Sequence, residues 1–131
     1  MVLAGLFALV NIIEIVIAAG PALDGAPGVV GALWAVHAAA FGLNLAAIAI
    51  ALIGLSRLAL SARLIPRALA VAAIPGAACL FAGALGTLVL VKGSPLLYVA
   101  LVGFLVWGVF VVGSSIGLLR GARRLPDRVG A

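Results

Sequence analysis

One glutamate stands out, because it lies within an apolar segment that is long enough to cross a membrane. Glu14 belongs to the apolar run 2–19, and no basic residue precedes Arg57. It is the only carboxylate of the chain that the pattern places inside a membrane. An acid at that depth costs ~2.5 kcal/mol or more, so an intramembrane carboxylate is by default a candidate functional residue.

Other polar and aromatic residues occur at helical spacing around this acid. Asn11 precedes Glu14 by three residues, so both lie on one face of a helix. The next apolar run carries one aromatic and polar face, built at alternating three- and four-residue steps from Trp34, His37, Phe41 and Asn44. The two runs are joined by a short turn, so we expect them to be antiparallel neighbours.

The depth of each residue predicts which of them meet. At 1.5 Å per residue, Glu14 lies ~7 Å, and Asn11 and His37 ~12 Å, below the outer ends of their helices. We therefore expect these three to meet in the outer half of the membrane. Asn44 lies ~22 Å from the same edge and should make a separate contact.

A carboxyl group beside an imidazole can hold and pass one proton. In that interpretation Glu14 is the proton donor, His37 sets its protonation state or takes the proton back, and Asn11 orients the carboxyl or binds a substrate oxygen. The alternative is structural, because polar side chains also tie membrane helices together, typically for ~0.6 kcal/mol each.

A metal or other cofactor is not expected. One histidine and one glutamate are too few ligands for a closed zinc site. Cys79 is the only cysteine, and inside an apolar segment it is expected to pack as a small hydrophobic residue.

Aromatic rings give a weaker indication of the substrate. Phe104, Trp107 and Phe110 recur at three-residue steps, and ring faces of this kind can stabilise a cationic substrate or a carbocation. Packing within the protein or against lipid would explain them equally. The predicted substrate-binding residues are Trp34, Phe41, Asn44, Phe104 and Trp107.

Composition requires lipid as the solvent. The chain of 131 residues is 67% hydrophobic and 8% charged, whereas soluble domains are about 45–50% apolar and about 25% charged. We predict a single all-α integral membrane domain over residues 1–131, a four-transmembrane-helix bundle with up-down-up-down topology. The expected spans are 2–19, 29–55, 68–91 and 96–119, followed by a basic tail at 120–131. The first segment lacks a positive n-region and is expected to be retained rather than cleaved as a signal peptide.

Basic residues are distributed unevenly along the chain. Seven of the eight lie in segment 56–67 and in the tail, which by the positive-inside rule puts both termini in the cytoplasm, in what we expect to be the bacterial cytoplasmic membrane. Segment 56–67 could lie flat at the interface as a short amphipathic helix. The arginines lack interleaved aromatic residues, so we expect no nucleic-acid partner. The residues expected to meet anionic lipid are Arg57, Arg63, Arg67, Arg120, Arg123 and Arg124.

Small residues recur at four-residue spacing on three of the predicted helices. Such ridges let helix backbones approach closely in lipid. They predict tight packing either within the bundle or between copies, so a homo-oligomer is possible. The ridges are Ala38, Gly42 and Ala46; Cys79, Gly83 and Thr87; and Gly113 and Gly117.

The chain resembles two families in having a carboxylate, Glu14, inside a predicted membrane span. Small multidrug resistance exporters are similar in having four short spans and one essential glutamate in the first, which implies proton-coupled transport by a dimer. Their glycine-rich third-helix pattern with a tryptophan is absent from 68–91. Integral membrane terpenoid and sterol cyclases and isomerases are similar in using membrane-buried carboxylates as acids, but none of their motifs occurs here. We assign the chain to neither family.

Three functional hypotheses follow. The first is an intramembrane acid–base enzyme, of the non-redox cyclase or isomerase type, acting on a lipophilic, terpenoid-like small molecule. The second is a proton-coupled exporter of small cations or drugs that works as a dimer through Glu14. The third is an accessory or assembly subunit of a larger membrane complex, whose polar residues only tie helices together.

Overall fold

The computed structural model describes residues 2–18, 27–87 and 96–122. Within these ranges the chain forms four helices and no strand: α1 (Val2–Ala18), α2 (Pro27–Ser61), α3 (Arg67–Leu85) and α5 (Leu96–Ala122). Three of them are long and apolar enough to cross a membrane, namely α2, α3 and α5. This indicates an integral membrane protein. The apolar helix α1 is shorter.

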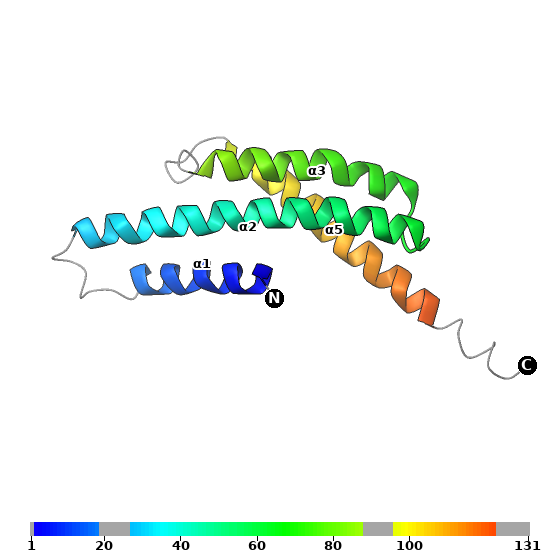
Figure 1. Cartoon of the computed structure of the whole chain (residues 1–131), viewed down its shortest axis with the longest axis horizontal. Coiled ribbons are helices and arrows are strands. Elements are labelled where there is room, and N and C mark those ends of the chain that lie inside the picture. The colour runs from blue at the N-terminus through cyan, green and yellow to red at the C-terminus, as the bar shows by residue number, and fades with distance from the viewer. Residues whose placement is uncertain (1, 19–26, 88–95, 123–131) are drawn as a thin grey trace, which may run out of the picture.

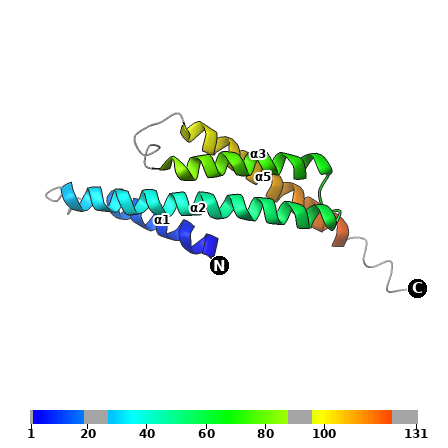
Figure 2. The same cartoon turned by 45° about the horizontal axis from the view of Figure 1, so that its top comes forward.

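Successive helices run in alternating directions, as Figure 1 shows. The helix α2 lies between α1 on one side and α3 on the other, in both views (Figures 1 and 2). The helix α5 packs chiefly against α3 and crosses it obliquely. The assembly therefore has a layered core of α2, α3 and α5, with α1 attached to the outer side of α2. The membrane orientation remains a prediction.

Glycines let α2, α3 and α5 approach closely. A Cβ atom on Gly103 would lie 2.7 Å from Cγ of Leu80 and 2.9 Å from the carbonyl oxygen of Gly76, and one on Gly83 would lie 2.7 Å from Cβ of Ala100. Both glycines therefore have to lack a side chain. The largest side chains that are fully buried in this core are Leu45, Leu52, Leu80 and Phe110.

The predicted ridges of small residues are used in packing within one chain. Gly42 approaches Thr87, Gly113 approaches Leu69, and Gly117 lies against the backbone of Leu64. Because no hydrophobic force drives helices together in lipid, close backbone approach is a main source of stability there.

The helix α2 is longer than the predicted span 29–55. It continues to Ser61 and ends in a turn, where the amide of Leu64 donates to the carbonyl of Ala59 at 2.8 Å and Arg63 has a positive φ of 56°. The predicted separate amphipathic helix at 56–67 is therefore wrong. A charge at Arg57 does not break a helix, and no proline lies between Arg57 and Pro66.

The other helix bounds differ from the predicted spans at their ends. The helix α3 continues through Pro75 and ends at Leu85, and the amide of Gly86 donates to the carbonyl of Ala82 at 3.0 Å. The helix α5 extends to Ala122, three residues past the expected end. Residues 88–91 of the third predicted span lie outside the described residues, as do Arg123 and Arg124.

Candidate functional site

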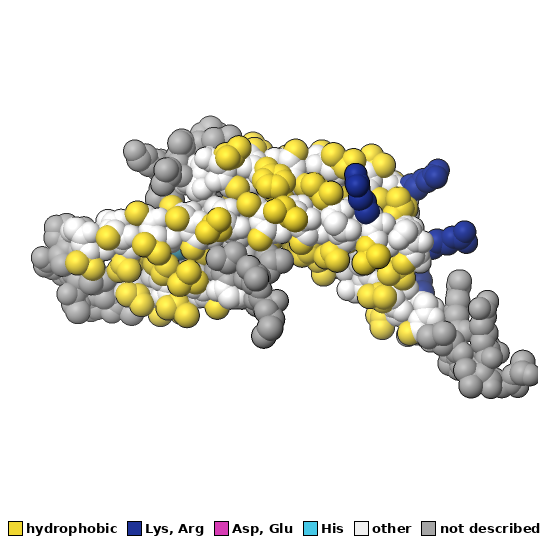
Figure 3. Space-filling model, viewed as in Figure 1, with side chains coloured by type: hydrophobic (Ala, Val, Ile, Leu, Met, Phe, Trp, Pro, Cys, Tyr) yellow, Lys and Arg dark blue, Asp and Glu magenta, His cyan; other side chains and the backbone are white. Residues whose placement is uncertain are grey.

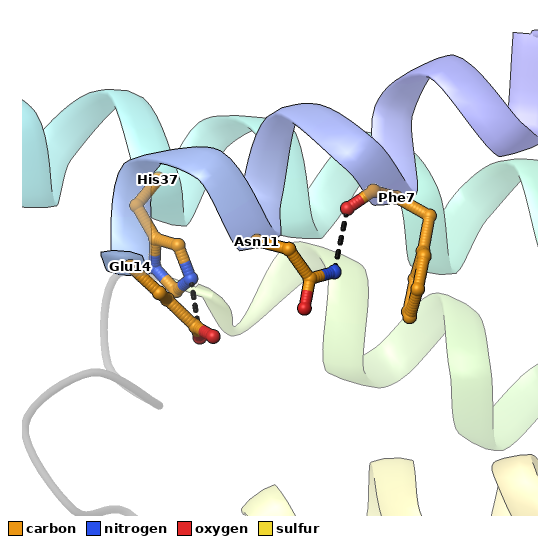
Figure 4. Close-up of polar contacts among 4 residues, drawn as sticks. All are labelled: Phe7, Asn11, Glu14 and His37. Atoms are coloured by element: carbon orange, nitrogen blue, oxygen red, sulfur yellow. Dashed lines mark hydrogen bonds and ion pairs between the residues drawn. The ribbon is translucent and has the colours of Figure 1, made fainter. Parts of the chain in front are cut away.

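The acid and the imidazole singled out from the sequence are in contact. Oε1 of Glu14 on α1 lies 2.9 Å from Nε2 of His37 on α2 (Figure 4). The two helices are antiparallel, and the pair joins the C-terminal part of α1 to the N-terminal part of α2. A carboxyl oxygen and a ring nitrogen at this distance share one hydrogen bond.

Glu14 and His37 differ in the exposure of their side chains. The His37 side chain is 10% exposed, whereas the Glu14 side chain is 53% exposed. The second ring nitrogen of His37, Nδ1, is buried without a hydrogen-bond partner among the described residues. Glu14 is therefore the member of the pair that another molecule can reach, and His37 lies behind it. The sequence predicted that Glu14 and His37 meet, but it did not predict that the Glu14 side chain is exposed.

Two aromatic rings hold the imidazole from either side along α2. The ring of Trp34 meets that of His37 edge-on, with centroids 5.2 Å apart and planes at 87°. The ring of Phe41 is stacked, with centroids 6.2 Å apart and planes at 12°. Aromatic pairs favour these arrangements. The predicted grouping of Trp34 and Phe41 around His37 is thus present.

Asn11 does not hydrogen-bond directly to the carboxyl group. Its Nδ2 donates to the carbonyl oxygen of Phe7, one turn earlier in α1, at 2.7 Å. Its amide oxygen points to the same side of α1 as the carboxyl of Glu14 (Figure 4). Asn11 is therefore placed to meet a molecule bound at Glu14, and a role in orienting the carboxyl is not supported by a direct hydrogen bond.

The remaining predicted substrate-binding residues lie elsewhere. Asn44 is buried in α2, two turns beyond His37, and its Oδ1 has no described partner. Phe104 and Trp107 are on α5 and pack against the core of α2, α3 and α5, where Trp107 stacks on Phe110 at 5.9 Å. The helix α1 packs against α2, so the structure does not bring these two rings to the Glu14–His37 pair.

The pair lies far from the basic end of the molecule. His37 and Arg57 are twenty residues apart on α2, a rise of ~30 Å, which equals the thickness of the hydrocarbon core. The end of α3 lies beside Gly42, because a Cβ there would meet Thr87, and His37 is five residues further toward the start of α2. This position, and the exposed tryptophan one turn further on, fit a site close to a membrane interface.

Neither a metal centre nor a known relative identifies this site. Among the described residues, no group of three or more His, Cys, Asp or Glu side chains could hold a metal ion. A comparison with protein-family models, with curated proteins and with solved structures found no match to the chain. The interpretation therefore rests on the chemistry of the pair and on its place in the helices.

Proposed function

We propose that this membrane protein is an acid–base enzyme that acts on a lipophilic small molecule at Glu14. The observation that carries the proposal is the 2.9 Å contact between an exposed carboxyl group and a buried imidazole. A lipophilic molecule dissolved in the bilayer would reach Glu14 from the open side of α1, without needing a tunnel through the protein.

The chemistry would be a proton-initiated isomerisation or cyclisation. The carboxylic acid of Glu14 transfers its proton to an alkene carbon or an epoxide oxygen of the substrate, and a carbocation forms. The resulting carboxylate is stabilised by a hydrogen bond from Nε2–H of His37. A proton then leaves a carbon next to the cation and returns to the carboxylate, so that the acid is restored and no other reactant is consumed.

The remaining residues would assist this chemistry. The exposed ring of Trp34 lies beside the pair and could stabilise the developing cation. The amide oxygen of Asn11 could accept a hydrogen bond from a polar group of the substrate. Phe104 and Trp107, which were expected to line the same pocket, are left out of this proposal because they lie on α5.

A second candidate is a proton-coupled carrier of small cations that works as a dimer. It is favoured by the exposure of Glu14 on a helix whose outer side carries many exposed apolar side chains. A second copy could cover this side of α1 and bring two carboxyl groups to a shared site. Those exposed apolar residues are Phe7, Leu9, Ile12, Ile15 and Val16.

Isotope exchange tests the enzyme without knowledge of the product. The purified protein, reconstituted in liposomes, is incubated in D₂O with a panel of polyprenyl alkenes, and carbon-bound deuterium in the recovered lipids is measured by mass spectrometry. We expect incorporation that Glu14→Gln lowers by about 10²–10⁴-fold, the usual contribution of general acid catalysis. Glu14→Gln should remain folded, because the amide can still hydrogen-bond to His37.

Three results would separate the hypotheses. No deuterium incorporation with any alkene, together with cation-driven proton flux that Glu14→Gln abolishes, would support the carrier. Neither activity in the folded wild-type protein would support the accessory role. Incorporation that is equal in the wild type and in Glu14→Gln would remove Glu14 from the mechanism.

A further inference from the structure

A second feature of the molecule, remote from Glu14, is an apolar groove between α3 and α5. It has a volume of about 680 Å³, within the usual range of ligand sites. It follows α5 from Phe104 to Arg120, a separation of sixteen residues and a rise of ~24 Å. The groove is lined almost entirely by apolar residues, and a single charged residue, Arg120, closes one end.

A smaller and more polar hollow of about 360 Å³ adjoins this groove. It is lined by Arg63, Arg120 and their neighbours, and it shares Leu64, Gly117 and Arg120 with the apolar groove. The two hollows therefore meet at Arg120. Figure 3 shows that the Lys and Arg side chains of this face gather at the same end of the molecule.

The backbone fixes the positions of the two arginines. Arg63 sits in the α2–α3 turn with φ 56°, and the close approach of Gly117 to Leu64 holds the end of α5 against this turn. Glu14, the one acidic residue in the described part of the chain, contacts His37 on the far half of α2. The described residues thus supply no negative charge to this basic end.

We propose that this double hollow binds one anionic phospholipid. The phosphate lies between Arg63 and Arg120, and one acyl chain lies along the apolar groove toward Phe104. Half of the hydrocarbon core is ~15 Å thick, so the groove is long enough for a chain that enters from one interface. An apolar channel that ends in two cationic side chains matches the amphipathic form of such a lipid. This site is more specific than a general attraction of lipid to surface arginines, and it does not depend on the function of Glu14.

Gly108 offers a way to block the groove without disturbing the fold. It lines the groove, and a Cβ added there would have no atom within 4 Å. Leucine at this position should therefore project into the space that the acyl chain would occupy. Gly54 on α2 is a matched control, because a Cβ there also has nothing within 4 Å and it does not line the groove.

The experiment measures lipid retained by the full chain in native mass spectrometry. The protein in detergent is titrated with phosphatidylglycerol or with phosphatidylcholine of identical acyl chains. We expect one tightly held phosphatidylglycerol, with Arg63→Gln and Arg120→Gln each weakening it about fivefold. Gly108→Leu should weaken retention of both lipids, whereas Gly54→Leu and Arg57→Gln should leave the first lipid unaffected.

Several outcomes would overturn the proposal. Equal retention of the two lipids would show that there is no headgroup site, and unchanged binding in Gly108→Leu would show that the acyl chain lies elsewhere. An equal loss in Arg57→Gln would indicate a diffuse basic surface. Inorganic phosphate that displaces the lipid at millimolar concentration would indicate an anion site without a role for the groove. Glu14→Gln should bind the lipid as the wild type does, so this test is independent of the catalytic one.

Discussion

The two sides of α2 are built on different principles. Toward α3 and α5, the helices are held by glycines and alanines that leave no room for another atom, as at Gly103 and Gly83. Toward α1, the chain is joined by a polar contact between Glu14 and His37 and by a few buried apolar side chains such as Val10 and Ile13. The first arrangement gives a rigid support. The second presents an ionisable group at an open surface, and the chemistry should therefore be separable from the stability.

The largest effect should come from the closely packed side. Gly103→Leu would force the new side chain into Leu80 and the backbone of Gly76, so we expect a loss of about 3 kcal/mol in the free energy of unfolding, at the upper end for overpacked cores. Steric trapping in mixed micelles measures this quantity. Gly5→Leu on α1 is the control, because a Cβ there has nothing within 4 Å. Similar losses of unfolding free energy in Gly103→Leu and Gly5→Leu would contradict the proposed difference between the two sides of α2.

A smaller effect is expected at the polar contact. His37→Leu removes an interhelical hydrogen bond, which in membrane proteins is worth ~0.6 kcal/mol on average. Hydrogen exchange followed by mass spectrometry should show faster exchange in α1, with α3 and α5 unchanged. If protection were lost throughout the molecule, the pair would be part of the stabilising core rather than a site attached to it.

The smallest effect should follow from Asn11→Leu. The Asn11 amide donates to a carbonyl of its own helix, so its removal leaves the packing of α1 on α2 intact. We expect a change in unfolding free energy within about 0.5 kcal/mol, typical of substitutions away from buried networks. Thermal unfolding in the same detergent is the measurement. A loss above 1.5 kcal/mol would mean that Asn11 ties α1 to another element.

The sequence predicted the helices and the central contact for clear physical reasons. Long apolar runs indicate membrane-spanning helices. Helices joined by a short turn are expected to be antiparallel neighbours, so residues at similar depth, such as Glu14 and His37, were expected to meet, and they do. The sequence could not predict which helices pack side by side beyond the first pair, or which face of each helix is buried. These helices are apolar on all sides, so their residue pattern does not say which face meets protein and which meets lipid. For this reason the exposure of Glu14 and the place of Phe104 and Trp107 were missed.

The end of α2 was missed for a different reason. The predicted span 29–55 ends before Arg57, but a helix can continue beyond the hydrocarbon, and α2 continues to Ser61. A helix of 35 residues rises ~52 Å and therefore exceeds the ~30 Å hydrocarbon core.

The most direct test of the central claim uses the fact that the chain has one glutamate and one histidine. Protein labelled with ¹³C at the glutamate side-chain carboxyl and with ¹⁵N in the histidine ring, in lipid bilayers, contains a single such pair for solid-state dipolar recoupling. A 2.9 Å contact between Oε1 and Nε2 predicts strong carbon–nitrogen dephasing at Nε2 and weaker dephasing at Nδ1. The absence of dephasing at both ring nitrogens would contradict the account, because Glu14 and His37 would then not form one site.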